Sequence, residues 1–312
     1  MANEEVQDMQ EQIVLAIKNN DKLKSVYRLQ IKLINSFAGR AIAVRRVVTN
    51  KGSRTPGIDN KILEGHEDYM AAIKILGQIT SNPKEYKAQP LRRVYIPKAN
   101  GERRGLGIPT INDRLVQAVY HLAVDPVVEQ LSDLSSFGFR KEKSTMDAVD
   151  YFRNYMDKRY SPNLVLEADI RKCFDRISHE FLMVNTPICH KSVLEQWLKC
   201  GVFELGIVKA TLEGTPQGGI ISPMLCNVAM NGLEKAIREE SGIDCTKNKV
   251  KIIRYADDVV ITGNSVEVLE KCKDIMIEFL IVRGLELNLD KTKITDIRDG
   301  LDLLGYNIRR RP

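Results

Sequence analysis

The segment RYADDVVITG, residues 254–263, places the adjacent carboxylates Asp257 and Asp258 between two strand-like arms. Apolar residues flank the pair in VKIIRY and VVIT, so the segment predicts a β-hairpin with both aspartates at or near its turn. Two ionised carboxylates about 4 Å apart repel by roughly 4 kcal/mol at an effective dielectric of about 20. Aspartate is also common in turns, so a solvated tip without function explains this segment equally well when it is taken alone.

A third carboxylate favours the functional interpretation over a solvated turn. Asp169 ends the apolar run NLVLEAD, residues 163–169, which predicts a buried strand. An unpaired carboxylate is costly to bury, but a cation would reconcile three converging carboxylates if this strand neighbours the hairpin. Oxygen ligands without histidine or cysteine nearby favour Mg2+. Two Mg2+ ions about 3.5–4 Å apart can clamp an in-line phosphoryl displacement. The predicted substrate is therefore a phosphate ester or a nucleoside triphosphate.

The composition is that of a globular protein with a basic lean. The chain has 312 residues, 43% of them hydrophobic and 28% charged, and a net charge of +6. Such a charge permits a polyanionic partner, although solvated surface lysines explain it as well. Residues 84–104 carry seven basic side chains against two acidic ones, and the chain ends in Arg309, Arg310 and Arg311. Clusters of this kind suit phosphate contacts.

Other features narrow the class of protein. The six cysteines form no CxxC pair and predict free thiols in a reducing compartment. The polar N-terminus is unlike a secretory signal, and no apolar run reaches about 18 residues, so we expect no membrane span and a cytoplasmic, intracellular protein. The phosphate-binding pattern GxxxxGK[ST] does not occur, which disfavours a P-loop NTPase.

Periodicity and turn signals predict an α+β fold without internal repeats. The Asn100-Gly101 pair predicts the turn of a hairpin over 91–109, and Pro126 is expected to end the helix before it. A glycine-rich loop at 214–219 feeds a helix that Ser222 and Pro223 would begin. Helices are also expected at 4–19, 21–48, 62–79, 112–124, 177–185, 191–199 and 265–283, a loop at 49–60, and strand-like segments at 284–295 and 301–308.

Several side chains suggest a role in binding nucleotides, each with an ordinary alternative. Phe174 could form a wall beneath a bound sugar or belong to the core. Gln217 stands on a loop whose glycines allow close backbone approach to a ligand, or on a simple helix-entry turn. Lys98, Arg104 and Lys291 could grip phosphates or be solvated charges. The same two interpretations apply to Lys51 and Arg54 in the loop 49–60.

The ordered set of segments resembles the maturase reverse transcriptases encoded within group II introns. The resemblance runs from about residue 45 to the C-terminus. YADD alone is a short motif, but the full series in this order is highly specific. The segments are NKGSRTPGIDN, RRVYIPKANGERRGLGIP, SSFGFRKEKST, LEADIRKCFDRI, GTPQGGIISPMLCNVAMNGLE, RYADDVVI, LNLDKTKI and LLGYNI.

The resemblance implies a right-hand polymerase fold and assigns roles to individual residues. Asp169 and Asp257 match the family's principal metal ligands, with the carbonyl of Ile170, and Asp258 matches the third carboxylate. Phe174 matches the residue that excludes a 2′-hydroxyl, and Gln217 a glutamine of the nucleotide pocket. Lys98 and Arg104 match the triphosphate-binding pair, and Lys291 a lysine near the pyrophosphate. The implied cofactor is a pair of Mg2+ ions, for which Mn2+ substitutes. The candidate RNA-binding residues are Lys51, Arg54, Arg92 and Arg93.

The expected organisation is an N-terminal extension and fingers at 1–150 and a palm with an antiparallel sheet at 151–312. The family continues into a helical thumb, whereas this chain stops after LGYNIRRRP, so we expect a fingers–palm fragment that holds primer-template poorly. The expected function is RNA-templated DNA synthesis together with binding of the parent intron RNA. The expected partners are intron RNA, an RNA template, a DNA primer and deoxynucleoside triphosphates, with no membrane. A homodimer, an RNA-binding splicing cofactor that never polymerises, and a retron or diversity-generating reverse transcriptase remain open.

Overall fold

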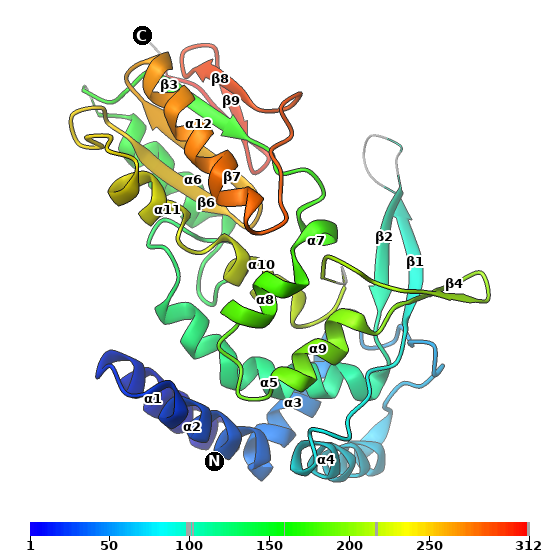
Figure 1. Ribbon diagram of the computed structural model, residues 1–312. Coiled ribbons are helices and arrows are strands. Elements are labelled where there is room, and N and C mark those ends of the chain that lie inside the picture. Colours follow the sequence, from blue (N-terminus) through cyan, green and yellow to red (C-terminus); the bar gives the residue numbers. More distant parts are fainter. Residues whose placement is uncertain (98–100, 102, 159, 216–217, 311–312) are drawn as a thin grey trace. The chain divides into compact units, whose positions relative to one another are not determined.

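The computed structural model describes residues 1–97, 101, 103–158, 160–215 and 218–310 (Figure 1). The chain divides into two compact units, one formed by Met1–Gln130 with Leu182–Leu225 and the other by Leu131–Phe181 with Cys226–Pro312. Helices and antiparallel strand pairs occur in both, so the predicted α+β class is confirmed. Among the described residues, no helix combines the length and the apolar character needed to cross a membrane.

The helices of the first unit pack around α5 (Ile111–Gln130), most of whose residues are buried. They are α1 (Ala2–Lys18), α2 (Leu23–Asn35), α3 (Phe37–Thr49) and α4 (Gly65–Ser81). The single helix expected over 21–48 is wrong, because Ser36 adopts an extended conformation and its Oγ accepts a hydrogen bond from the Gly39 amide at 2.9 Å. A Cβ atom at Gly39 would lie 2.3 Å from the Leu33 carbonyl oxygen, so glycine permits this sharp corner between α2 and α3.

The expected end of the helix at Pro126 is also wrong, because α5 continues through it to Gln130. Proline has no amide hydrogen, so the carbonyl four residues earlier, that of Leu122, loses its usual partner in the helix. The side chain of Gln10 on α1 replaces it, since its Nε2 donates to the Leu122 oxygen at 2.7 Å. A helix packed alongside thus supplies the hydrogen bond that the proline removes.

We expect Gln10→Ala to destabilise the protein by about 1–2 kcal/mol, because the Leu122 carbonyl would lose the Gln10 donor in a half-buried position. Gln7→Ala on the same helix is the matched control. Gln7 donates to Glu11 at 3.1 Å on the exposed face, so its loss should change the free energy of unfolding by less than about 0.5 kcal/mol. Urea unfolding measures both values, and equal effects of the two substitutions would contradict this account of Pro126.

A four-stranded sheet in the first unit has the order β2-β1-β4-β5. The predicted hairpin is present as β1 (Leu91–Pro97) and β2 (Arg103–Ile108), paired antiparallel. The short strands β4 (Val202–Glu204) and β5 (Ile207–Lys209) were not predicted, because three residues are too few to show a period of two. β4 extends the sheet by pairing parallel to β1, and α9 (Lys191–Lys199) precedes it in the chain.

The second unit contains an all-antiparallel sheet with the order β6-β7-β3-β8. Its strands are β6 (Lys251–Tyr255), β7 (Asp258–Gly263), β3 (Leu164–Ala168) and β8 (Lys293–Asp296). Val165, Ile253 and Val260 share one buried cluster with α6 (Thr145–Met156). The opposite face meets α12 (Val266–Ile281), where a Cβ atom at Gly263 would lie 2.8 Å from Leu269 (Figure 1). The central strands are therefore covered on both faces.

The remaining elements are short. They are α7 (Cys173–Arg176), α8 (His179–Asn185), α10 (Ser222–Met230), α11 (Leu233–Lys235) and a π-helical turn over Ala236–Glu240. The single strand expected at 301–308 is instead a hairpin of β9 (Leu301–Leu303) and β10 (Tyr306–Ile308). Its two turn residues, Leu304 and Gly305, have φ angles of +54° and +85°, which suit a tight two-residue hairpin turn.

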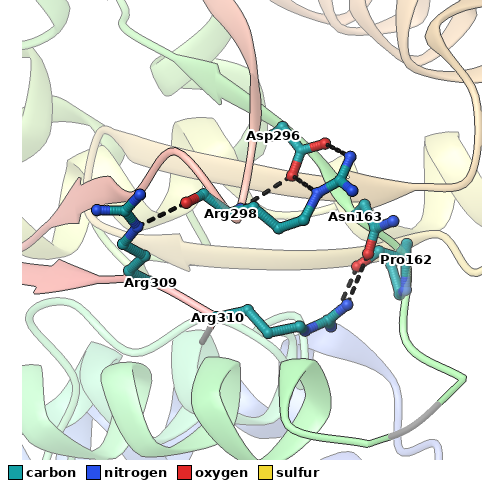
Figure 2. Close-up of polar contacts among 6 residues, drawn as sticks. All are labelled: Pro162, Asn163, Asp296, Arg298, Arg309 and Arg310. Atoms are coloured by element: carbon teal, nitrogen blue, oxygen red, sulfur yellow. Dashed lines mark hydrogen bonds and ion pairs between the residues drawn. The ribbon is translucent and has the colours of Figure 1, made fainter. Parts of the chain in front are cut away.

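Two of the C-terminal arginines that the sequence suggested for phosphate contacts, Arg309 and Arg310, donate hydrogen bonds to protein groups (Figure 2). Arg310 donates to Asn163 Oδ1 at 2.7 Å and to the Pro162 carbonyl oxygen at 3.3 Å. Arg309 donates to the Arg298 carbonyl oxygen at 2.6 Å, and the Arg298 guanidinium pairs with Asp296. The Arg310 bonds hold this segment against the residues before β3, and the Arg309 bond holds it against Arg298. Arg311 lies outside the described residues.

Candidate active site

Three carboxylates lie at one end of the sheet in the second unit. Asp169 follows the last residue of β3, Asp258 is the first residue of β7, and Asp257 lies in the turn between β6 and β7. Because β3 and β7 run antiparallel with Ala168 opposite Val259, the end of one strand adjoins the start of the other. The sequence-based expectation that these strands are neighbours is therefore met.

The electrostatics of Asp258 show that the three groups sense one another. The pKa of Asp258 is raised from 3.8 to about 6, first by shielding of its carboxyl group from water and then by repulsion from Asp257 and Asp169. The residue as a whole remains exposed at the end of its strand, although its carboxyl group is partly shielded from water. A bound cation at this end of the sheet would relieve the repulsion.

We expect Asp258→Asn to raise the melting temperature by a few degrees at pH 8 in a metal-free buffer. The folded state disfavours the ionised form of Asp258, so above its folded pKa of about 6 the charge lowers stability, while below about pH 4 the group is protonated in both states and costs nothing. The gain should therefore develop between pH 4 and pH 6. Thermal unfolding of both proteins across this range tests it, and identical melting temperatures at pH 8 would contradict the assigned repulsion.

The turn that carries Asp257 is held from inside the protein by Arg254. This guanidinium is buried, with 1% of the residue exposed. Its Nη1 donates to the carbonyl oxygen of Ala256 at 3.2 Å and to Asn227 Oδ1 at 3.0 Å, and its Nη2 donates to Asn231 Oδ1 at 3.0 Å. Ala256 has a φ of +59°, a left-handed conformation that alanine rarely adopts. The buried arginine thus stabilises the unusual backbone directly before Asp257.

The segment before β8 fixes the main chain around Asp169. The amide of Asn288 donates to the Asp169 carbonyl oxygen at 2.8 Å, and its Nδ2 donates to Asp169 Oδ2 at 2.9 Å. Ile170, which follows Asp169, and Leu287, which precedes Asn288, form an antiparallel β-bridge. Lys291 is exposed in the same short turn, its amide donating to the Asn288 carbonyl oxygen at 3.0 Å. One loop therefore connects three of the residues singled out from the sequence.

Phe174 lies on α7, five residues after Asp169, and is 7% exposed. The ring of Phe139 meets it edge-on, with the ring centroids 6.0 Å apart and the planes at 75°. Beside it, the Cys173 and Cys226 sulfur atoms are 4.0 Å apart, and both thiols are free. The Phe174 side chain is therefore mostly buried, and the residue lies close along the chain to Asp169.

The other candidate nucleotide-binding residues belong to the first unit. Arg104 is exposed on β2, opposite Ile96. Lys98 and Gln217 lie outside the described residues. Among the residues that follow Gln217, the Ile220 amide donates to Gln117 Oε1 at 2.9 Å. Gly218 has a φ of +109°, and a Cβ atom there would come within 3.0 Å of the Gly107 carbonyl oxygen on β2.

The candidate RNA-binding residues lie in two places of the first unit. Lys51 and Arg54 are exposed on the loop after α3, and Arg92 and Arg93 are half-buried on β1. The loop is fixed by the buried Arg114 of α5, which donates to the carbonyl oxygens of Gly52 at 3.2 Å and of Thr55. Its shape is thus set from the core, while its own basic side chains face solvent.

Arg254, Asn227 and Asn288, which hold the carboxylate end of the sheet, were not predicted from the sequence. A signal existed for Arg254, because a charged residue between Ile253 and Tyr255 in a strand bordered by apolar residues must be buried or must break the strand. Asn227 stands in the apolar helix segment MLCNVAM, where an amide also requires partners. No signal identified Asn288, whose contacts depend on residues more than 100 positions away.

The donor set at this end of the sheet consists of oxygen atoms. Within the described part of the chain, no three histidine, cysteine, aspartate or glutamate side chains are gathered as a metal-binding cluster. The carboxylates of Asp169 and Asp257 and the carbonyl of Ile170 are nevertheless hard ligands of the type that Mg2+ prefers. Burial is the first cause of the raised pKa of Asp258 and repulsion from Asp257 and Asp169 is the next, so the residues fit a divalent cation in chemistry and in charge.

Comparison with known proteins identifies the family. A sequence model described as "Reverse transcriptase (RNA-dependent DNA polymerase)" matches residues 96–308, and one described as "N-terminal domain of reverse transcriptase" matches residues 1–76. This chain belongs to the reverse transcriptase family. Membership implies a dependence on a divalent metal ion and an RNA template.

Individual relatives of this reverse transcriptase include proteins encoded by introns. Protein YkfC of Escherichia coli is 31% identical over 98% of this chain and 89% of its own length. Group II intron-encoded protein LtrA of Lactococcus lactis is 29% identical over 86% of this chain, and the putative COX1/OXI3 intron 2 protein of Saccharomyces cerevisiae is 24% identical over 98%. The chain spans 55% and 42% of the lengths of these two relatives. The resemblance to maturase reverse transcriptases of group II introns is confirmed.

Proposed function

We propose that this reverse transcriptase extends a DNA primer on an RNA template by means of the three carboxylates at the end of its second-unit sheet. The primer 3′-hydroxyl would attack the α-phosphate of a deoxynucleoside triphosphate and release pyrophosphate. The pairing of β3 with β7 carries the proposal, because in a chain of this family it brings Asp169 to the sheet end at which Asp257 and Asp258 lie. We also propose that residues 1–150 form the N-terminal extension and fingers and that residues 151–312 form the palm.

In this proposal Asp169 and Asp257 hold two Mg2+ ions together with the Ile170 carbonyl, and Mn2+ substitutes for Mg2+. Bound there, the ions supply a lowered pKa for the attacking hydroxyl and neutralise charge on the leaving oxygens. Asn288 leaves one oxygen of Asp169 free by donating to the other, at 2.9 Å. Asp258 adds negative charge that favours cation binding.

Nucleotide selection falls to the remaining candidates. Phe174 would border the deoxyribose and exclude a 2′-hydroxyl, and Lys291 would meet the pyrophosphate. Lys98, Arg104 and Gln217 would contact the incoming nucleotide. This division matches side-chain chemistry to substrate, since a covered aromatic ring suits a sugar face and flexible cations suit phosphate.

We also propose that the chain binds intron RNA and assists splicing. Its relatives named for group II introns and maturases support this role. Lys51 and Arg54 are exposed on a loop whose conformation Arg114 stabilises. Arg92 and Arg93 lie on β1. Exposed cations on a fixed loop suit backbone phosphates, whose contacts weaken as salt increases.

Primer extension with purified protein tests the polymerase proposal. We expect a DNA product that requires the RNA template, deoxynucleotides and Mg2+, and that is lost in Asp169→Asn. Asp299→Asn, on an exposed loop of the same unit, is the matched control and should retain wild-type activity. If wild-type protein binds RNA but never extends a primer with Mg2+ or Mn2+, the alternative of an RNA-binding splicing cofactor is favoured instead.

A further inference from the structure

Phe139 has a backbone conformation that is unusual for an aromatic residue. Its φ is +61°, in the left-handed region, where bulky side chains are genuine outliers. The residue is also 46% exposed, so burial of its ring does not explain the strained backbone. Strained residues persist where surrounding structure holds them, and they concentrate at functional positions.

The chain on both sides of Phe139 is fixed. Before it, the Phe137 amide donates to the Arg254 carbonyl oxygen at 2.8 Å, and the Gly138 carbonyl oxygen accepts from Asn227 Nδ2 at 3.0 Å. A Cβ atom at Gly138 would lie 2.2 Å from the Ala256 amide nitrogen, so this segment runs directly against the turn that carries Asp257. After it, Arg140 Nη1 donates to the Ser136 carbonyl oxygen at 2.6 Å. These contacts fix the main chain from which the Phe139 ring projects.

The ring projects toward Phe174. The two ring centroids are 6.0 Å apart with the planes at 75°, an edge-to-face pair. Phe174 itself stands on α7, which has only four residues and follows Lys172 at a φ of +47°. A helix of a single turn gives a side chain little support of its own, so a neighbouring ring that blocks one direction of movement has a large influence on its orientation.

We propose that Phe139 is a positioning residue that fixes the orientation of Phe174 and thereby strengthens discrimination against ribonucleotides. The inference rests on the proposed function, in which Phe174 excludes the 2′-hydroxyl. A steric gate excludes a single oxygen atom only while its ring stays in place. Loss of the Phe139 ring lets Phe174 rotate away, and the ribose enters more readily.

Two substitutions separate the ring from the backbone. Asparagine tolerates the left-handed conformation, so Phe139→Asn removes the ring while it keeps the strained turn accessible. Phe139→Tyr keeps the ring edge. Because the side chain is half exposed, neither change buries a polar group. Phe174→Val is the reference for a lost gate.

Single-nucleotide incorporation on an RNA template measures the effect as the ratio of kcat/KM for a deoxynucleotide to kcat/KM for the matching ribonucleotide. We expect Phe139→Asn to lower this ratio by about 3- to 10-fold, the range that one edge-to-face pair supports, with kcat/KM for the deoxynucleotide changed less than about twofold. Phe139→Tyr should match wild type, and Phe174→Val should lower the ratio further.

An unchanged ratio in Phe139→Asn together with a lowered ratio in Phe174→Val overturns the inference and leaves the proposed function intact. An unchanged ratio in both overturns the inference as well, because Phe139 acts through Phe174. Fluorine NMR of protein containing 4-fluorophenylalanine gives a readout independent of activity. The Phe174 resonance, assigned by its loss in Phe174→Val, should shift in Phe139→Asn and not in Phe139→Tyr. An unshifted resonance in Phe139→Asn overturns the inference even in a protein that does not polymerise.

Discussion

Asp257→Ala is expected to lower nucleotide incorporation by about a thousandfold or more, because it removes a carboxylate that we propose holds both ions, and metal stabilisation of the reacting charges is worth several kcal/mol. Primer extension by the full-length protein measures the loss. RNA binding should be spared, since the candidate RNA contacts lie in the other unit. Asp299→Asn is again the control, as an exposed carboxylate without a role in the proposed site.

A second measurement on Asp257→Ala separates a lost metal site from a lost fold. A ligand that binds only the folded state raises its apparent stability, so Mg2+ should raise the melting temperature of wild type and of Asp299→Asn. The increase should be absent in Asp257→Ala, whose melting temperature without metal should be at least that of wild type, because a repelling charge next to Asp258 is gone. Retained polymerisation by this variant would refute the site assignment.

Arg254→Met is expected to destabilise the protein by about 3 kcal/mol, the largest stability effect that the structure suggests. The acceptors on Asn227, Asn231 and Ala256 would lose buried charged donors at 3.0–3.2 Å, and each unsatisfied buried group costs about 1–3 kcal/mol. The stability of Arg254→Lys should lie between those of wild type and Arg254→Met, because an ammonium group cannot reach acceptors on both sides as a guanidinium does. Urea unfolding gives the values.

The control for this substitution is Arg298→Met. Arg298 pairs with Asp296 at 2.6 Å, but its side chain is 66% exposed, so we expect a much smaller loss of stability than in Arg254→Met. Wild-type stability in Arg254→Met would mean that the buried network does not hold the turn before Asp257. The Arg254 variants should also lose incorporation in step with stability, since Ala256 would no longer be held in its left-handed conformation.

The sequence predicted those parts of the molecule in which a local pattern is sufficient. The alternation in VKIIRY and VVIT, the apolar run ending at Asp169, and the Asn-Gly turn signal each correspond to observed strands. The resemblance then placed Asp169 and Asp257 correctly at one end of a sheet, although their roles as ligands stay a prediction. Periodicity could not reveal β4 and β5, because each has three residues; β4 pairs with the edge of β1, and β5 pairs with β4.

The features that the sequence did not predict lie where distant residues decide local structure. Pro126 continues a helix because Gln10, 116 positions earlier, supplies a hydrogen bond to Leu122 four residues before the proline. Phe139 adopts a left-handed conformation because Asn227 and the Ala256 turn hold the residue before it. The sequence alone does not indicate the conformation of these residues, since the contacts that stabilise it form only in the folded chain.

The order of strands in the second-unit sheet affects how the protein is made. β3 lies between β7 and β8, so Leu164–Ala168 finds both of its partners only after Asp296 has been synthesised. At ribosomal rates of about 5–20 residues per second, that interval is roughly 6–25 s. Until β7 has emerged from the ribosome, this apolar strand has both edges open to other nascent chains, and one edge stays open until β8 has emerged. Newly made protein is therefore most vulnerable to aggregation before β7 and β8 emerge, and chaperone capacity should limit its yield more than the stability of the finished fold.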